Sequence, residues 1–73
     1  SKNYRNRLIG TTVEGLMEEA QEIDGICWQV GHTREYVKVA VPQDESLTNQ
    51  TVQVFVDGFR DPEMMQGKLR LNL

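Results

Sequence analysis

Cysteine and histidine are almost absent from this sequence. Cys27 is the only cysteine and His32 the only histidine among 73 residues, so the chain cannot form an internal disulfide. A structural zinc site needs four ligands, usually cysteine and histidine, and is not predicted. A lone thiol is typical of a reducing compartment, which indicates a cytoplasmic protein. We expect Cys27 to be buried as a small apolar side chain.

Catalytic groups are equally scarce. His32 has no nucleophile at a suggestive spacing, and the six glycines do not form a phosphate-binding loop. The carboxylates of residues 18–24 indicate a solvated acidic loop rather than a cation site. The sequence therefore predicts no catalytic residue, no metal ligand and no cofactor in this chain.

Long apolar runs and a basic excess are also missing. No run approaches the ~20 residues of a membrane-spanning helix, and no signal peptide is visible, so no membrane partner is expected. The chain has eight basic and eleven acidic residues, which gives a net charge of −3. Nucleic-acid-binding proteins usually carry a basic patch or excess, which argues against strong RNA binding by this chain alone. Because the chain starts at Ser1, we expect it to be part of a longer protein. We also expect the isolated chain to be monomeric.

Alternating apolar and polar residues predict strands in the second half of the chain. Valines alternate with other residues over 36–41 and 52–57, and leucines do so over 68–73. Period two places such residues on one face of a strand. Turn-forming segments separate the runs, and residues 26–30 offer a fourth strand. Short strands between turns predict a small antiparallel sheet or barrel.

Residues 11–25 are ambiguous. The apolar residues between 13 and 20 recur at helical spacing, and Thr11 with Glu14 matches a capping box. Gly15 in the middle of the segment would cost a helix ~1 kcal/mol relative to alanine. A strand would place Val13 and Met17 on one face. The local pattern favours a helix and leaves both structures open.

Four stretches in sequence order resemble a TRAM domain: GTTVEGLMEEA, GHTREYVKVAV, NQTVQVFVDGF and GKLRLNL. TRAM domains lie at the C terminus of tRNA methylthiotransferases and in some other RNA-modifying enzymes. The resemblance covers residues 8–71, and residues 31–41 are most similar to the branch acting on N6-threonylcarbamoyladenosine in tRNA.

The resemblance implies an all-β fold, a small five-stranded antiparallel β-barrel related to oligonucleotide-binding and SH3-like folds. The barrel would span residues 11–73, with residues 1–10 as a linker from a preceding domain. It favours a strand over the ambiguous segment. The expected strands lie near 12–19, 25–31, 35–41, 51–58 and 66–71. The apolar sides of these runs predict the core residues Val13, Met17, Ile26, Trp28, Val37, Val39, Val41, Val52, Val54, Val56 and Leu69.

The resemblance also implies that the polar stretch before the third strand lies on the side that meets tRNA. Gly31 would allow a tight turn, and Thr33 would hold it by a side-chain-to-backbone hydrogen bond. Basic side chains would contact phosphates, and two rings would contact bases or sugars. The expected RNA contacts are Arg34, Lys38, Lys68 and Arg70 for phosphates, and His32 and Tyr36 for bases or sugars.

The expected function is that of an accessory domain without catalytic activity. It would help to hold the tRNA anticodon stem-loop for 2-methylthiolation of N6-threonylcarbamoyladenosine by catalytic domains of the same polypeptide. Those domains would use 4Fe-4S clusters and S-adenosylmethionine, which the single Cys27 cannot support. The alternative is a structural module that packs on the catalytic domain with little RNA contact. An independent acidic adaptor without any RNA role is a third interpretation.

Overall fold

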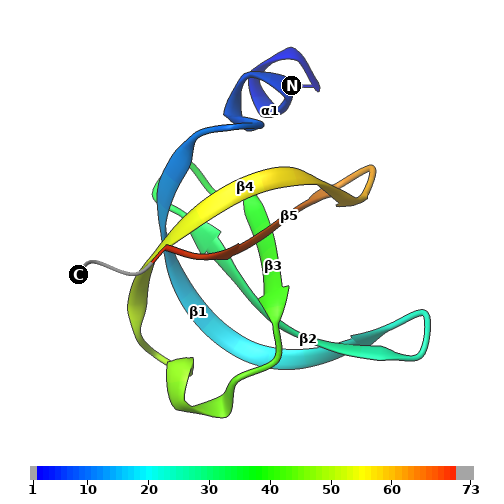
Figure 1. The fold of residues 1–73 in the computed structure, drawn as a ribbon, viewed down its shortest axis with the longest axis vertical. Coiled ribbons are helices and arrows are strands. Elements are labelled where there is room, and N and C mark those ends of the chain that lie inside the picture. The colour runs from blue at the N-terminus through cyan, green and yellow to red at the C-terminus, as the bar shows by residue number, and fades with distance from the viewer. Residues whose placement is uncertain (1, 71–73) are drawn as a thin grey trace.

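The computed structural model describes residues 2–70, with side chains from residue 4 onward, and most of them lie in β-strands (Figure 1). The predicted all-β fold is thus confirmed. The elements in chain order are α1 (Lys2–Leu8), β1 (Thr12–Ile23), β2 (Ile26–Thr33), β3 (Lys38–Pro42), the short 3₁₀ helix η1 (Glu45–Leu47), β4 (Thr51–Asp61) and β5 (Met64–Leu69). Residue 71, the predicted end of the last strand, lies outside the described residues.

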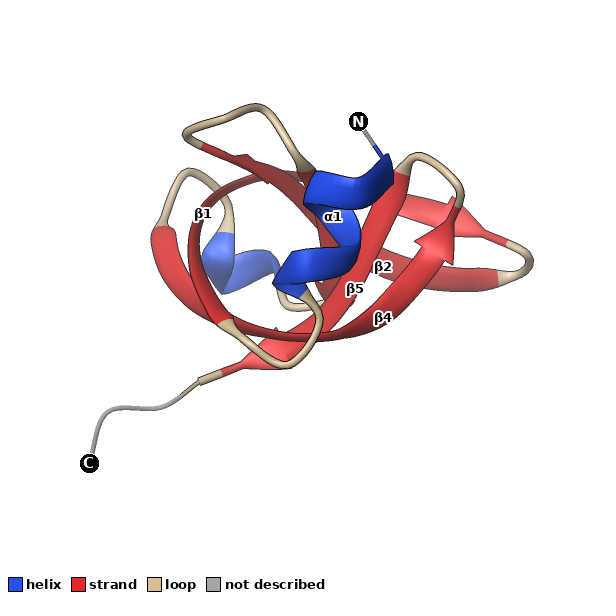
Figure 2. Cartoon of the chain, turned by 90° about the horizontal axis from the view of Figure 1, so that it is seen from above, coloured by secondary structure: helices blue, strands red, loops and turns tan. Residues whose placement is uncertain are grey.

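The five strands close into a barrel in the order β1-β2-β3-β5-β4, and β4 pairs back to β1 (Figure 2). The prediction of a strictly antiparallel barrel is wrong at one seam, because β3 and β5 are parallel. Lys38 lies opposite Met64 there, and Ala40 lies opposite Gln66. After β3 the chain passes through η1 to pair β4 with β1, so the antiparallel β4–β5 hairpin returns β5 beside β3 in the same direction.

The ambiguous segment is a strand, as the family resemblance implied. β1 pairs with β4 through residues 12–16 and with β2 through residues 15–23. A bulge between Met17 and Glu19 shifts the register, and Glu18 and Glu19 are both exposed. The local pattern favoured a helix because Leu16 completes a helical spacing with Val13 and Met17, although it lies on the outer face of the strand and is 40% exposed. β1 also continues past its predicted end at residue 19, and its last residues form a long hairpin with β2.

Most of the predicted core is confirmed. The interior of the barrel contains Met17, Val37, Val39, Val41, Leu47, Val54, Val56 and Met65, with the partly buried Val13, Val52 and Leu69 packed against them. The prediction for Ile26 is wrong, since its side chain is 56% exposed. Ile26 follows the Asp24–Gly25 turn at the tip of the β1–β2 hairpin, where no third strand pairs. Cys27, in the same arm, is exposed rather than buried.

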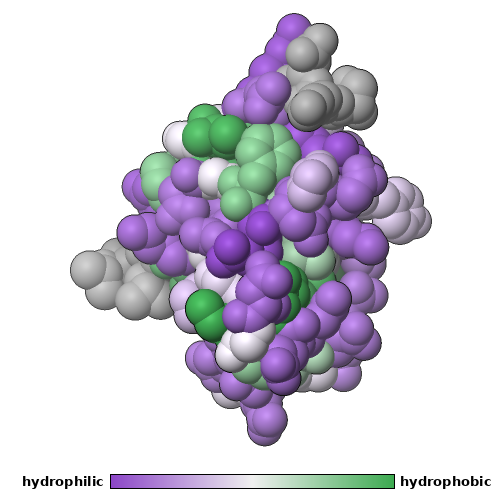
Figure 3. All heavy atoms as spheres, turned by 90° about the vertical axis from the view of Figure 1, so that its right-hand side faces the viewer, coloured by the Kyte–Doolittle hydropathy of each residue, from purple (hydrophilic) through white to green (hydrophobic). Residues whose placement is uncertain are grey.

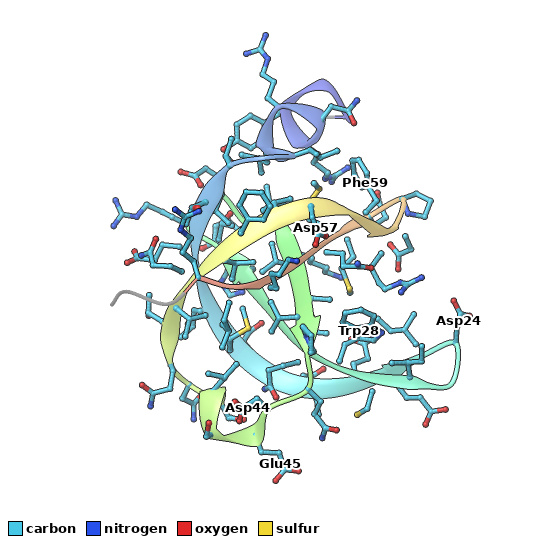
Figure 4. The ribbon with its side chains drawn as sticks, viewed as in Figure 1. Asp24, Trp28, Asp44, Glu45, Asp57 and Phe59 are labelled. Atoms are coloured by element: carbon cyan, nitrogen blue, oxygen red, sulfur yellow. The ribbon has the colours of Figure 1, made fainter. Side chains whose placement is uncertain are left out.

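Trp28 is buried as predicted, but in a second cluster outside the barrel interior. Its partners are Val30, Ala40 and Met64, which alternate along β2, β3 and β5 with the inward-facing residues. Arg60 of β4 places its guanidinium carbon 5.2 Å from the centre of the Trp28 ring. Trp28 lies near the base of the hairpin, whereas Asp24 lies at its tip (Figure 4). The outer face of β2, β3 and β5 is therefore partly apolar.

The two short helices lie at opposite ends of the barrel (Figure 1). Residues 2–8, expected in a linker, form α1, whose Leu8 packs against the core. The backbone N–H of Gly10 donates to the carbonyl of Val56 at 2.7 Å. At the other end, Asp44 caps η1 by accepting a hydrogen bond from the backbone N–H of Ser46 at 3.0 Å. No helix within residues 2–70 combines the length and apolar character needed to cross a membrane.

Candidate nucleic-acid interface

The polar stretch after Val30 ends β2 and turns into β3. The backbone N–H of Tyr36 donates to the carbonyl of Thr33 at 2.9 Å, and that of Thr33 donates to the carbonyl of Val37 at 2.9 Å. The Thr33 hydroxyl accepts a hydrogen bond from the backbone N–H of Val37 at 3.2 Å. Thr33 makes the predicted kind of side-chain-to-backbone hydrogen bond, but it holds the turn over residues 33–37 and not a turn at Gly31.

Gly31 has a different role from the predicted one. It lies inside β2 rather than in a turn, opposite Met17 of β1. A Cβ atom at this position would lie 2.1 Å from the carbonyl oxygen of Leu16. Glycine is therefore required because the two strands approach closely beside the bulge, not because the backbone turns.

Tyr36 has the most unusual environment in this stretch. It was expected within a strand, yet it occupies the turn with a φ of 66°, a left-handed conformation that is uncommon and strained for a bulky residue. Its side chain is 81% exposed. The ring stacks on the imidazole of His32, with ring centres 5.3 Å apart and planes inclined by 15°. The result is an aromatic surface held outside the barrel.

Charged groups surround this pair of rings. The Nδ1 atom of His32 lies 3.1 Å from the Glu18 carboxylate. Lys38 is exposed, as expected for the outer face of its strand, and it lies opposite His32 in the pairing of β2 with β3. One acidic and one basic side chain thus approach the rings.

A hollow of about 320 Å³ opens beside the rings. We call it the Tyr36 hollow; its lining includes Glu18, Glu19, Val30, His32, Tyr36 and Lys38. Small-molecule sites span ~300–1,000 Å³, so the hollow has room for one planar ring system. The buried Val30 and Met64 give it an apolar side, and the charged groups make the rest of its lining polar.

The structure brings together only part of the predicted contact set. His32, Tyr36 and Lys38 line the Tyr36 hollow. Arg34 lines two other hollows, both shared with Glu14, and His32 also lines one of these. β3 and β5 are neighbours, but Lys38 pairs with Met64 at the start of β5.

The remaining two basic residues lie toward the end of β5. Lys68 pairs with Phe55 of β4, and the backbone N–H of Arg70 donates to the carbonyl of Gln53. At ~3.3 Å per residue, the backbone of Lys68 lies roughly 13 Å along β5 from that of Met64. The six predicted contacts therefore do not form a single basic face.

Several residues that line the Tyr36 hollow were not predicted from the sequence. Glu19 and Gln21 of β1, Val30 of β2 and Met64 of β5 line the hollow but were not predicted as site residues. Strict alternation would have placed Glu18 and Glu19 on opposite faces, whereas the bulge leaves both exposed. The available signal was the misfit of this segment to a period of two.

In the described part of the chain, no group of three histidine, cysteine, aspartate or glutamate side chains could hold a metal ion. Comparison with family models, curated proteins and solved structures found no match. The geometry of the site and the resemblance of the sequence to TRAM domains are therefore the observations that bear on function.

Proposed function

We propose that this chain contacts RNA through the Tyr36 hollow. The observation that carries the proposal is the exposed Tyr36 ring, stacked on His32 beside a hollow that Lys38 also lines. Unpaired bases stack on aromatic side chains, each contributing ~1–3 kcal/mol, and an adjacent ammonium group can meet the phosphate. A strained turn that exposes a large ring is typical of a binding site rather than of a stabilising contact.

The resemblance to TRAM domains specifies the RNA that we propose. The chain would be an accessory domain of a tRNA methylthiotransferase and would help to hold the anticodon stem-loop for 2-methylthiolation of N6-threonylcarbamoyladenosine. The 4Fe-4S clusters, S-adenosylmethionine and catalytic groups would belong to other domains of the polypeptide. Attachment to those domains would raise the local concentration of this site near the tRNA. A weak site would then be sufficient.

The affinity of the isolated chain for tRNA is expected to be low. Its net charge is −3, and the carboxylates of Glu18 and Glu19 lie in the lining of the same hollow as Lys38. These negative charges repel the phosphate backbone that the lysine attracts. Binding should therefore require low ionic strength and weaken as salt is added.

Two lysines provide a matched test. Lys38 lines the Tyr36 hollow, whereas Lys68 is exposed on β5 opposite Phe55. Lys38→Gln and Lys68→Gln change the net charge equally. With a fluorescent anticodon stem-loop, anisotropy should show a several-fold loss of affinity for Lys38→Gln and a smaller loss for Lys68→Gln. Equal losses would mean that general charge, not this site, attracts the RNA.

Protein docking is the second candidate function, and the β1–β2 hairpin favours it. Ile26 is 56% exposed and lies opposite Ile23, with Glu22 and Asp24 exposed beside them. On the side of the molecule that carries the hairpin tip, apolar patches lie within a mainly hydrophilic surface (Figure 3). An apolar tip with carboxylates suits a basic protein surface. This role predicts that Ile26→Ser weakens association with catalytic domains and leaves RNA affinity unchanged.

A further inference from the structure

The bulge in β1 provides the Tyr36 hollow with a carboxylate that is not already paired. The carboxylate of Glu18 lies 3.1 Å from Nδ1 of His32 and is engaged there. Glu19 lies opposite Val30 of β2, is exposed and also lines the hollow. Within the described part of the chain, its carboxylate makes no hydrogen bond or ion pair. Both of its oxygens therefore remain available to a ligand.

The rest of the hollow suits a flat ring with an attached phosphate. Val30 and Met64, 8% and 5% exposed, offer apolar contact. The Tyr36–His32 pair offers an aromatic face, and Lys38 lies opposite His32 on the adjacent strand. The hollow thus combines an apolar surface, an aromatic face, a cation and a carboxylate that only accepts hydrogen bonds. This combination is typical of a nucleotide site rather than of a general phosphate site.

We propose that the Tyr36 hollow selects guanine, read by the carboxylate of Glu19; this inference rests on the proposed RNA-binding function. The Watson–Crick edge of guanine carries two adjacent donors, the N1–H and the 2-amino group, which one carboxylate can accept together. Adenine and cytosine present one amino group beside a ring nitrogen with a lone pair, which repels a carboxylate. Uracil presents one N–H between two carbonyl oxygens. Paired hydrogen bonds of this kind are the ones that discriminate between bases.

An arginine side chain is the competing occupant. Its guanidinium group also has adjacent N–H donors and stacks on aromatic rings. Glu18 is engaged with His32, which leaves Glu19 and Lys38 as the oppositely charged pair in the lining. A neutral base with an attached phosphate matches both members of this pair, whereas a guanidinium group matches only the carboxylate. The geometry therefore supports a nucleotide over a basic peptide.

The test uses a pentauridine RNA and the same RNA with guanine, adenine or cytosine at its centre. Each is titrated into the ¹⁵N-labelled chain at low salt while the amide signals of Val30 and Gly31 are followed. We expect the guanine-containing RNA to bind roughly five- to tenfold more tightly than pentauridine. Glu19→Gln should abolish this preference without weakening pentauridine binding, because the amide replaces one acceptor with a donor and removes a negative charge.

Glu14→Gln is the matched control, since Glu14 is also exposed on β1 but lines other hollows. It should keep the guanine preference. Equal binding of all four RNAs with shifts at Val30 and Gly31 would overturn the guanine inference and leave the RNA site standing. Shifts caused by N-acetylarginine amide but by no RNA would overturn both and assign the hollow to a basic peptide. No shift at the hollow with any probe would also overturn both.

Discussion

At the scale of single residues, two glycines set how closely neighbouring strands approach. A Cβ atom on Gly31 would lie 2.1 Å from the carbonyl oxygen of Leu16, and one on Gly67 would lie 2.3 Å from that of Phe55. The nearest neighbours of Gly31 are backbone atoms, which cannot rotate away as a flexible side chain can, whereas Gly67 also lies close to the Val54 side chain. Gly31 also lines the Tyr36 hollow, so the packing of β1 on β2 and the shape of the site depend on the same residue.

Gly31→Ala is expected to destabilise the fold strongly. Overpacking in a core usually costs ~1–3 kcal/mol, and a backbone contact should place this variant at about the upper end. Gly58→Ala is the control, because a Cβ atom there would meet nothing within 4 Å; its stability should change by less than about 1 kcal/mol. Urea denaturation followed by Trp28 fluorescence measures both. Similar stabilities would show that β1 and β2 can separate at little cost.

At Tyr36 the requirements of stability and of RNA binding are expected to conflict. Its φ of 66° is strained for a bulky residue, and its side chain is 81% exposed, so little burial compensates for the strain. Tyr36→Gly should leave the free energy of unfolding unchanged or raise it by up to about 1 kcal/mol. The same variant should lose most RNA affinity, because the stacking surface is gone. A clearly less stable Tyr36→Gly variant would mean that the ring holds the turn rather than a ligand.

At the scale of elements, much of the architecture could be predicted from the sequence. The valine alternations of β3 and β4 were visible because each strand has one face in the core, with residues such as Val39 and Val54 fully buried. For β1 the local pattern favoured a helix and left a strand open, because the outward-facing Leu16 gives the segment a helical spacing. The parallel pairing of β3 with β5 depends on the route of the chain between strands, which local patterns do not encode.

Only those residues of the candidate site that lie close together in the sequence could be predicted. His32, Tyr36 and Lys38 lie within one short stretch of sequence, and the structure keeps them together. Glu19 and Met64 reach the same hollow only through the bulge and the β3–β5 pairing. Tertiary pairing also separates Lys68 from Lys38, since Lys38 lies opposite Met64 at the start of β5 and Lys68 lies near its end.

Arg60 and Trp28 connect β4 to the base of the β1–β2 hairpin. The guanidinium carbon lies 5.2 Å from the ring centre of the buried Trp28, within the range of a cation–π contact worth ~0.5–2 kcal/mol from exposed to desolvated sites. Arg60→Met, which keeps much of the packing but removes the charge, should lower stability by about that amount. Arg60→Lys should retain part of it. Thermal unfolding, with Trp28 as the only tryptophan reporting the contact, measures the series; equal stability of Arg60→Met and the parent chain would contradict it.

At the scale of the whole molecule, the charge distribution governs how the domain would meet RNA. Eleven acidic residues outnumber eight basic ones, and the basic residues expected to bind phosphate are spread over the barrel. Few of them could contact one short RNA segment together. Single-stranded RNA binding changes with salt by a slope of ~0.7 per phosphate neutralised, so the domain should show a low affinity that falls further as salt is added.

The most direct test of the account is an NMR titration of the ¹⁵N-labelled chain with an anticodon stem-loop RNA at low salt. If RNA binds at the Tyr36 hollow, the largest amide shifts occur at Val30, Gly31, His32, Tyr36 and Lys38, and the hairpin tip near Ile26 responds little. Shifts confined to the tip, or to the end of β5 near Lys68, would contradict it. A complete lack of response under conditions where the domain is folded would contradict it as well.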